Sequence, residues 1–397
     1  MEMRILSLLL LVHGKAVLEN EVADSIYIYI EHGKINEIGP IEALPTHLKD
    51  VEKIDISKEQ HVVPGFIDVH IHGAAGADTM DATIESLETM AKALPAEGTT
   101  SFLATTITQK HENIENALKN AALYLKGHND SGKSEILGVH LEGPFINAKR
   151  AGAQPKEYII DPDIELFKHW QELAEGSIKL VTVAPELENG TNFVAYLHEN
   201  DVIASIGHSD AIYEEMEKAV EAGAKQVTHL FNGMRGIHHR EPGVAGSALL
   251  FKELMVELIA DGIHVRPEVM KLVINAKGTE GMILITDAMR AKCLKSGIYD
   301  LGGQDVSVAD GKALLADGTL AGSILKMNDS IKNILEAAEI SLSEAVQMAS
   351  VNPAKQLKVY DRKGAISAGK DADITILSSE YQVDMTICRG EIAYKKG

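Results

Sequence analysis

PGFIDVHIHG, at residues 64–73, is a mostly apolar run that closes with two histidines separated by one residue. Such a run, marked by proline and glycine, predicts a β-strand, which we place at residues 62–72. Side chains at positions i and i+2 of a strand point to the same face, so the imidazoles of His70 and His72 can reach one point. The stretch predicts a strand whose carboxyl end presents two metal-ligating side chains.

Seven further strand-like runs follow this one along the chain. They lie at residues 99–108, 136–143, 178–186, 201–209, 226–232, 255–264 and 282–289. Amphipathic helical stretches separate the runs, and one of them has Asp161 or Asp163 as its candidate N-cap and Gly176 after its end. Strands that alternate with helices predict a parallel sheet, and eight such units predict a closed (β/α)₈ TIM-like barrel, which we assign to residues 61–358.

The two ends of the chain differ from this middle part, because short strand-like runs and turns replace the helices. Residues 25–39 predict a hairpin with Gly33 in its turn, and residues 369–377 and 385–396 also read as strands. We therefore expect residues 1–60 and 359–397 to form one small β-sandwich domain. The apolar run Ile5–Val12 favours an N-terminal strand over a signal peptide, because no small-residue cleavage site follows it.

Composition narrows the classes of function. The 397-residue chain is 45% apolar and has a formal net charge of −20. Such an acidic protein is a poor partner for nucleic acids or anionic membranes. Its two cysteines, Cys293 and Cys388, cannot form a disulfide framework, which favours a reducing, cytoplasmic location. No activating motif surrounds Cys293, so we expect an inert thiol there.

Other predicted strands also end in residues that can bind a metal. Glu142 closes the third strand, His208 the fifth, His229 the sixth and Asp287 the eighth. In a closed barrel all these ends meet at one mouth, where active sites of this fold lie. One histidine alone is more often a satisfied surface or core residue. Four histidines and two acids at one mouth predict a centre for zinc, iron, cobalt, nickel or manganese that activates water for hydrolysis.

Two loop regions near this mouth are candidates for substrate binding. NGMRGIHHREPG, at residues 232–243, is basic in an acidic chain, which favours either an anionic substrate or a solvated loop. Its positive charge comes from Arg235 and Arg240, and from His238 and His239 when they are protonated. Residues 290–320 are turn-rich and hairpin-like, and we interpret them as an extended loop at the carboxyl-terminal face of the barrel. The eighth helix then comes late, at residues 323–340.

Seven motifs together resemble the amidohydrolase superfamily: PGFIDVHIHG, HLEGPF, GHSDA, THLFNGM, HHREPG, ADGIH and LITDAM. The resemblance runs from about Val62 to Lys358 and extends into both β-rich ends. The first motif marks the superfamily alone. HLEGPF, THLFN and REPG are more specific, and resemble the deacetylases of this superfamily that act on 6-phosphorylated N-acetylated amino sugars.

The resemblance implies roles for individual residues. Glu142, His208 and His229 match a primary metal site, and His70 and His72 match a second one. The expected cofactor is one or two divalent metal ions per subunit, with no organic cofactor. Asp287 matches the catalytic acid and base.

For the substrate, the resemblance implies that Asn232, the backbone of Gly233, and Arg240 bind the sugar phosphate. Other sugar contacts match Ala153, His264, Leu320, Ala321 and Gly322. A homodimer is implied, and Arg240 serves either its own site or that of the neighbouring subunit. Gly233 and Arg235 depart from the usual residues of these deacetylases. Gly233 would keep its N–H contact, whereas Arg235 adds charge near the phosphate or lies in solvent.

Two alternatives remain at this point. Another amidohydrolase, such as a cyclic amidase or a deaminase, would share the barrel and the first motif. Those enzymes usually place other ligands after the third strand, including a carboxylated lysine, where this chain has Glu142. A catalytically inactive barrel would be a structural or interaction protein, and such proteins usually lose metal ligands or the final aspartate.

Overall fold

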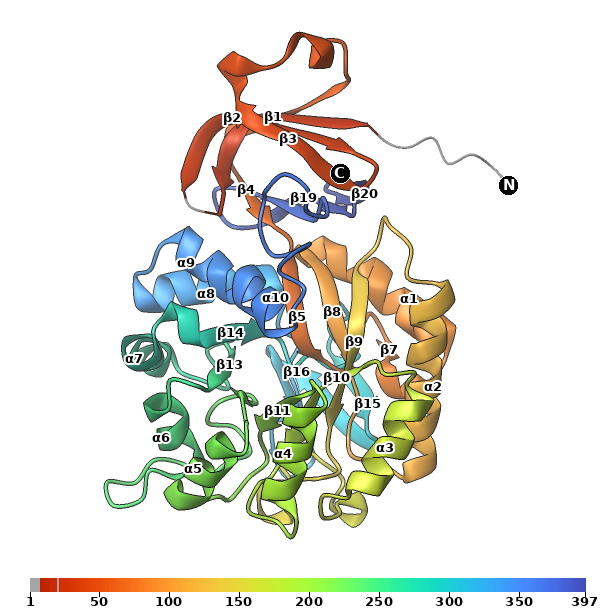
Figure 1. Cartoon of the computed structure of the whole chain (residues 1–397), viewed down its shortest axis with the longest axis vertical. Coiled ribbons are helices and arrows are strands. Elements are labelled where there is room, and N and C mark those ends of the chain that lie inside the picture. Colours follow the sequence, from red (N-terminus) through yellow and green to blue (C-terminus); the bar gives the residue numbers. More distant parts are fainter. Residues whose placement is uncertain (1–7, 20) are drawn as a thin grey trace.

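The computed structural model describes residues 8–19 and 21–397. Figure 1 shows a β-sheet domain at the top, built from both terminal regions, above a larger barrel of strands and helices. Within the described ranges, no helix is long and apolar enough to cross a membrane.

The barrel contains the eight parallel strands that the sequence predicts, in the order β14-β13-β12-β11-β10-β9-β8-β5. Their bounds are β5 Phe66–Ile71, β8 Thr99–Thr105, β9 Glu135–Glu142, β10 Ile178–Val183, β11 Ile203–Ile206, β12 Gln226–Val227, β13 Met255–Ile259 and β14 Met282–Ile285. The barrel fold is thereby confirmed. The sixth strand is much shorter than the expected residues 226–232, because the chain turns away after Val227, with positive φ angles at His229 and Phe231.

The barrel closes where its first and last strands meet. Ile71, the last residue of β5, forms a parallel bridge with Ala288, which lies just beyond the end of β14. The backbone N–H of Asp287 donates to the carbonyl of His70 at 2.8 Å, and that of His72 donates to the carbonyl of Ala288 at 2.9 Å. The seam of the barrel therefore runs directly through three of the predicted site residues.

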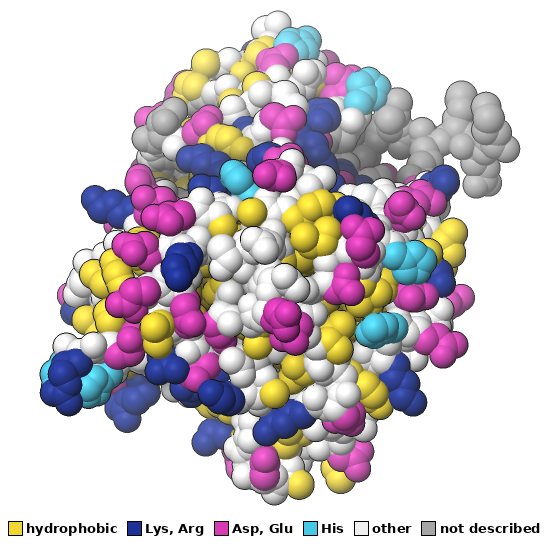
Figure 2. Space-filling view, turned by 60° about the horizontal axis from the view of Figure 1, so that its bottom comes forward, with side chains coloured by type: hydrophobic (Ala, Val, Ile, Leu, Met, Phe, Trp, Pro, Cys, Tyr) yellow, Lys and Arg dark blue, Asp and Glu magenta, His cyan; other side chains and the backbone are white. Residues whose placement is uncertain are grey.

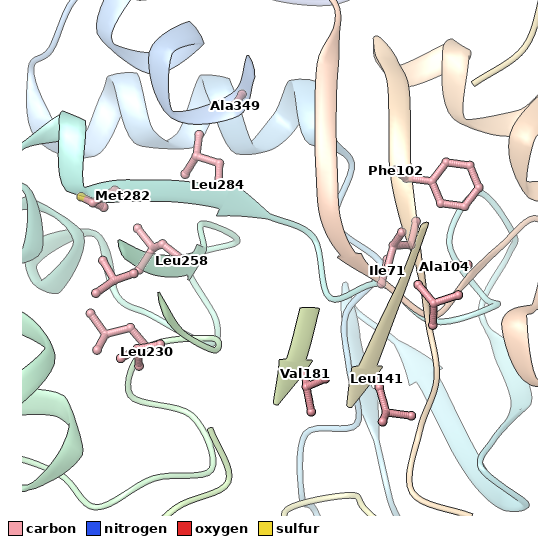
Figure 3. Close-up of a cluster of buried hydrophobic side chains, with 14 of the residues drawn as sticks. Ile71, Phe102, Ala104, Leu141, Val181, Leu230, Leu258, Met282, Leu284 and Ala349 are labelled. Carbon is pink, nitrogen blue, oxygen red and sulfur yellow. The ribbon is translucent and has the colours of Figure 1, made fainter. Parts of the chain in front are cut away.

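Alternation along the strands separates the core from the site. Ile71 lies in the main apolar cluster, whereas His70 and His72, one residue to either side, belong to the metal-ligand candidates. Figure 3 shows Ile71, Ala104, Leu141 and Val181 on neighbouring strands of this cluster. Eight helices flank the strands: α1 Ile84–Ala93, α2 His111–Gly127, α3 Ile164–Leu173, α4 Gly190–Glu199, α5 Tyr213–Glu221, α6 Gly243–Leu250, α7 Pro267–Lys277 and α8 Met327–Ala338. The short helices α9 Leu342–Val346 and α10 Asn352–Gln356 follow α8.

The signals at the ends of α3 act as expected. Asp163, of the two N-cap candidates, accepts hydrogen bonds from the backbone N–H groups of Glu165 and Leu166. Gly176 after the helix has a φ of +77°, a conformation that favours glycine.

The terminal domain is one continuous seven-stranded sheet, in the order β20-β19-β18-β4-β1-β2-β3. The bounds are β1 Leu9–Val17, β2 Val22–Glu31, β3 Lys34–Pro40, β4 Lys53–Pro64, β18 Ile374–Leu377, β19 Val383–Cys388 and β20 Glu391–Lys395. The expected sandwich takes the form of this single sheet, whose β1 to β4 share an apolar cluster with β18 and β19. The domain boundary expected after residue 60 falls inside β4, which continues to Pro64.

The predicted N-terminal strand is present as β1, and Leu10, Leu11 and Val12 are buried in it. Residues 5–7 of the predicted run lie outside the described residues. The predicted hairpin at residues 25–39 corresponds to β2 and β3, with Gly33 in the turn.

Residues 290–320 form an ordered layer at the site. Strands β15 Gly297–Leu301, β16 Gln304–Ala309 and β17 Lys312–Leu314 make a three-stranded antiparallel sheet. Its apolar side chains pack with Ile107 and Met289, so the layer is anchored to the barrel. Near β5, a two-stranded sheet pairs β6 Gly73–Ala74 with β7 Ala77–Asp78.

A buried ion cluster joins the barrel to the terminal domain. Lys363, whose side chain is 1% exposed, contacts Glu135 at 2.6 Å and Asp373 at 2.5 Å. Glu135 begins β9 of the barrel, whereas Asp373 precedes β18 of the sheet. Arg362 also binds Glu135 with both terminal nitrogens. Burial lowers the pKa of Lys363, but Asp373 and Glu135 outweigh it and raise the pKa above its usual value.

We expect Lys363→Met to lower the free energy of unfolding by about 3–5 kcal/mol, because it leaves buried carboxylates without their cation. Urea unfolding followed by circular dichroism measures the change. Lys358→Met is the matched control, because the ion pair of Lys358 with Asp201 is 68% and 73% exposed. Equal losses in both variants would contradict a role of the buried cluster in joining the domains.

Candidate metal centre and active site

A pocket opens at the carboxyl ends of the barrel strands and collects most of the predicted residues. Those that line it are His72, Glu142, Ala153, His208, His229, Asn232, Gly233, His264, Asp287, Leu320 and Gly322. His70 and Ala321 are fully buried behind this lining. Arg240 lies elsewhere, on an exposed loop.

The first group of candidate ligands is Glu142, His208 and His229. The Nε2 atoms of His208 and His229 lie 3.2 and 3.1 Å from Oε1 of Glu142 and 3.1 Å from each other. Atoms that share one metal ion at roughly 2.0–2.1 Å are separated by about this distance. The three side chains can therefore hold one ion without moving far.

The second group is His70, His72 and again Glu142. Nε2 of His70 lies 3.4 Å from Oε1 of Glu142, and Nε2 of His72 lies 3.3 Å from Oε2. Oδ1 of Asp287 is 3.4 Å from the first of these nitrogens and 3.3 Å from the second. Glu142 therefore stands between two adjacent groups, and Asp287 borders the second.

Hydrogen bonds determine which nitrogen of two histidines faces Glu142. Nδ1 of His208 donates to the carbonyl oxygen of Arg150 at 2.8 Å, and Nδ1 of His70 donates to Glu257 at 2.9 Å. With Nδ1 as the donor, the neutral form of each ring would present the lone pair of Nε2 to Glu142. A lone pair that faces a carboxylate is repelled unless a cation or a proton lies between them. The donor set therefore fits a divalent metal ion.

The carboxylates of the site favour the protonated form of the neighbouring imidazoles. Burial lowers the pKa of His72, but hydrogen bonds with Asp287 and Glu142 outweigh it and raise the pKa to about 9. Burial raises the pKa of Glu142, but His70, His208 and His229 hold it well below its usual value. A metal ion would supply the same positive charge and would displace these protons.

Three of the site residues adopt the left-handed backbone conformation. The φ angles are +46° at His208, +30° at His229 and +48° at Asp287. Such conformations cost roughly 1–3 kcal/mol each, and hydrogen bonds hold them here. The carbonyl of Asp287, for example, accepts from the N–H of Ser323 at 2.7 Å. The local backbone is bent to direct these side chains into the pocket.

Gly233 packs directly against a candidate ligand. Its φ is +56°, and a Cβ atom at this position would lie 2.8 Å from Nδ1 of His208. Glycine at this place keeps the backbone of the loop close to the imidazole. Further round the pocket, Nδ1 of His264 contacts Asp261 at 2.6 Å. Burial lowers the pKa of His264, but Asp261 outweighs it and raises the pKa above its usual value, which favours the protonated ring.

The basic segment divides into two environments. Arg235 is held by Asp210, with Nη2 to Oδ2 at 2.9 Å, and Asp210 also binds Arg150. Arg240 instead bonds to the neighbouring His239 on the loop that precedes α6. This loop projects at the lower left of Figure 1, and Figure 2 shows basic and histidine side chains gathered on that projection. The charge of Arg235 is therefore largely neutralised, whereas Arg240 is exposed and does not line the pocket of its own subunit.

Sequence reasoning missed several residues of the site. Gln154 lines the pocket and donates to Oε2 of Glu142 at 2.7 Å. Ile107 and Leu301 form an apolar side of the pocket. Glu257 lies behind the ligands, and its signal was available: it is the one acid in the otherwise apolar run MVELIA, inside a strand of a parallel sheet that is normally buried on both faces.

Cys293 has no environment that would activate it. Burial raises the pKa of its thiol above the usual value, although the residue reaches the surface. The expectation of an inert thiol agrees with this direction.

The sequence pattern of the amidohydrolase family matches residues 61–393. The chain belongs to the amidohydrolase family. Amidohydrolases are typically metal-dependent, which agrees with the two groups of candidate ligands that share Glu142.

Relatives within this family carry a more specific name. An N-acetylglucosamine-6-phosphate deacetylase of Bacillus subtilis is 50% identical, and the match covers 95% of each chain. One of Lysinibacillus sphaericus is 46% identical over 92% of each chain. The structure of a mutant of the Mycobacterium smegmatis deacetylase, in complex with N-acetyl-D-glucosamine 6-phosphate, has a TM-score of 0.91 at 30% identity and covers 98% of this chain and 100% of that one.

The geometry predicts how metal content responds to substitution. We expect Glu142→Ala to abolish metal binding, because Glu142 contacts both groups, and His208→Ala to empty the first group. His70→Ala should remove the second ion alone. Plasma mass spectrometry of the purified protein measures the stoichiometry. His47→Ala is the control, because this histidine lies in the terminal domain and is exposed. Full activity with stoichiometric metal in Glu142→Ala would show that the ligands are assigned wrongly.

Proposed function

We propose that this amidohydrolase deacetylates N-acetyl-D-glucosamine 6-phosphate to D-glucosamine 6-phosphate and acetate, in amino-sugar catabolism and cell-wall recycling. The observation that carries the proposal is the position of Asp287, which lines the pocket with its Oδ1 atom 3.3–3.4 Å from His70 and His72. A carboxylate at this place suits hydrolysis of an amide beside a metal centre. A cytoplasmic location is part of the proposal.

Glu142 and the imidazoles would hold a divalent metal ion, which would polarise the acetamide carbonyl and acidify a water molecule. Zinc, iron, cobalt, nickel and manganese all suit this donor set. One or two ions per subunit correspond to the two ligand groups.

Asp287 moves the proton. Burial raises its pKa, but His70 and His72 outweigh this effect and keep the pKa below its usual value. Asp287 is therefore ionised at neutral pH and can accept a proton from the attacking water. It then delivers that proton to the amide nitrogen, which would otherwise be a very poor leaving group.

The remaining lining residues orient the sugar. Ala153, Leu320 and Gly322 supply close, uncharged walls, and His264 can donate a hydrogen bond. The apolar wall that Ile107 and Leu301 form excludes water from the reacting amide. Ala321 is fully buried behind the lining and supports its neighbours Leu320 and Gly322, which face the pocket.

The phosphate group needs a cation that the pocket of one subunit does not provide. In the described part of the chain, no lysine or arginine lines the pocket, and Asn232 and the N–H of Gly233 are neutral. The net charge of −20 also repels a phosphate. We propose that Arg240, on its projecting loop, completes the phosphate site of the neighbouring subunit in a homodimer.

The decisive assay compares deacetylation of the 6-phosphorylated sugar with that of unphosphorylated N-acetylglucosamine. The proposal expects a strong preference for the phosphorylated substrate. Equal activity on both would exclude a phosphate site, and a cyclic amidase or deaminase substrate would then be tested. Bound metal without any hydrolysis would favour the inactive barrel.

Asp287→Asn tests the proton transfer. The amide keeps the shape of the side chain but cannot accept a proton, so we expect turnover to fall by roughly 10² or more, the usual scale for general acid–base catalysis. Steady-state kinetics measure the loss, and metal analysis checks that the ions are retained. Turnover near that of the wild type would assign the proton transfer to another residue.

Arg240→Ala tests the phosphate contact. A charge-assisted hydrogen bond contributes roughly 1.5–3 kcal/mol, so KM for the phosphorylated sugar should rise about ten- to a hundredfold. The slow reaction of the unphosphorylated sugar should stay nearly unchanged. Comparable losses on both substrates would mean that Arg240 has a structural role instead.

Mixing two variants distinguishes the two possible sites of action. A dimer of one Arg240→Ala subunit and one Asp287→Asn subunit has an intact Asp287 in the first and an intact Arg240 in the second. If Arg240 serves its neighbour, refolding the two variants together restores a low KM. If it serves its own subunit, the mixture stays as poor as the separate variants.

A further inference from the structure

Glu257 is a buried acid whose neighbours are unusual. It lies on β13 and is 0% exposed. Within the described ranges, its one ionisable partner within 4.0 Å is His70. Glu97, by comparison, is also buried and pairs with the cation of Lys292 at 2.6 Å. Burial of a carboxylate without a cation is costly, so the neighbours of Glu257 must supply the compensation.

Three hydrogen bonds satisfy the carboxylate of Glu257. Oε2 contacts Nδ1 of His70 at 2.9 Å and accepts from the backbone N–H of His229 at 3.1 Å. Oε1 accepts from the side-chain amide of Gln226 at 2.6 Å. Two of the three donors therefore belong to candidate metal ligands, one from each of the two groups.

The contact with His70 selects one form of its imidazole. A carboxylate without a proton can only accept, so the ring carries its proton on Nδ1 and leaves Nε2 for a metal. The negative charge of Glu257 also increases the electron density that Nε2 can donate. His70 thereby becomes a stronger ligand of its group.

The contact with His229 acts on the backbone. His229 has a φ of +30°, which is unfavourable for a residue with a side chain. The carboxylate of Glu257 holds its N–H, and the carbonyl of Glu257 accepts from the N–H of the next residue, Leu230, at 2.9 Å. The side chain and the backbone carbonyl of Glu257 therefore both hold the turn that directs His229 toward Glu142.

We propose that Glu257 is a positioning residue that fixes a ligand of each metal group and so sets the metal affinity of the centre. The inference rests on the proposed metal centre and extends it to a residue outside the ligand set. The larger effect falls on the His70 group, because there Glu257 acts on the ligand atom's own ring. In the other group it acts through the backbone.

Glu257→Gln removes the charge and keeps the shape of the side chain. Titration of the metal-free variant with Zn²⁺ against a chromophoric chelator gives the dissociation constants, and the constant that is absent in His70→Ala identifies the His70 group. We expect that constant to weaken by roughly 10–100-fold, the usual range for a partner of a ligating histidine. The constant of the other group should change less. When Co²⁺ is bound in place of Zn²⁺, the visible absorption of the ion in the His70 group should differ between Glu257→Gln and the wild type.

Glu135→Gln is the matched control. Glu135 is also a largely buried carboxylate, but it pairs with Arg362 and Lys363 at the amino end of β9, the opposite end of the strand from Glu142. This variant should lose thermal stability and keep both metal affinities. If Glu257→Gln does not fold, Glu257→Asp keeps the charge but withdraws it from His70, and the same selective weakening is expected.

Two outcomes overturn the inference alone. One is a Glu257→Gln protein with both affinities of the wild type. The other is a uniform loss of both affinities that follows the loss of stability, which would indicate a merely structural role. Failure of the wild-type protein to bind Zn²⁺ would instead overturn the metal centre itself, and this inference with it.

Discussion

The site depends on one electrostatic constraint: four imidazoles and two carboxylates converge on one pocket. In the described part of the chain, no lysine or arginine lines this pocket. Glu142 stands at the centre and contacts all four histidines within 3.1–3.4 Å. Coulomb attraction to protons or to a metal ion compensates for the burial of these groups. The rest of the barrel mouth keeps the ligands from turning away from one another when no ion holds them.

That restraint comes mainly from the closing seam of the barrel. Asp68 is fully buried, and its Oδ1 accepts from the backbone N–H groups of His70 at 3.2 Å and Thr286 at 3.3 Å. Its Oδ2 accepts from the hydroxyl of Thr286 at 2.5 Å. Asp68 thus ties β5 to β14 one residue before Asp287. Glu257 does the same between β5 and the turn after β12, so buried acids join strands at the positions where ligands leave them.

The fold and most of the site could be predicted from the sequence, because strand ends and ligand types are local signals. The pair His70 and His72 needs only the two-residue period of a strand, and the barrel then brings distant strand ends together. The short β12 could not be predicted in this way. Its apolar continuation reads as strand, but the turn that directs His229 toward Glu142 depends on tertiary contacts. Gln154 was missed for a similar reason, since its role comes from a hydrogen bond to a residue twelve positions earlier.

The environments of Arg235 and Arg240 show why charge patterns alone do not locate a binding site. Both belong to one basic segment, yet Asp210 neutralises the first, and the second lies exposed on a projecting loop. In the proposed dimer, the metal centre of each pocket and the cation that binds the phosphate therefore come from different subunits. The buried centre provides the reaction, because precise ligand positions need a rigid core. The cation comes from an exposed loop, where a charged side chain is solvated until the partner subunit and the substrate approach it. This arrangement avoids a permanently buried arginine beside a metal ion, which would weaken the binding of that ion.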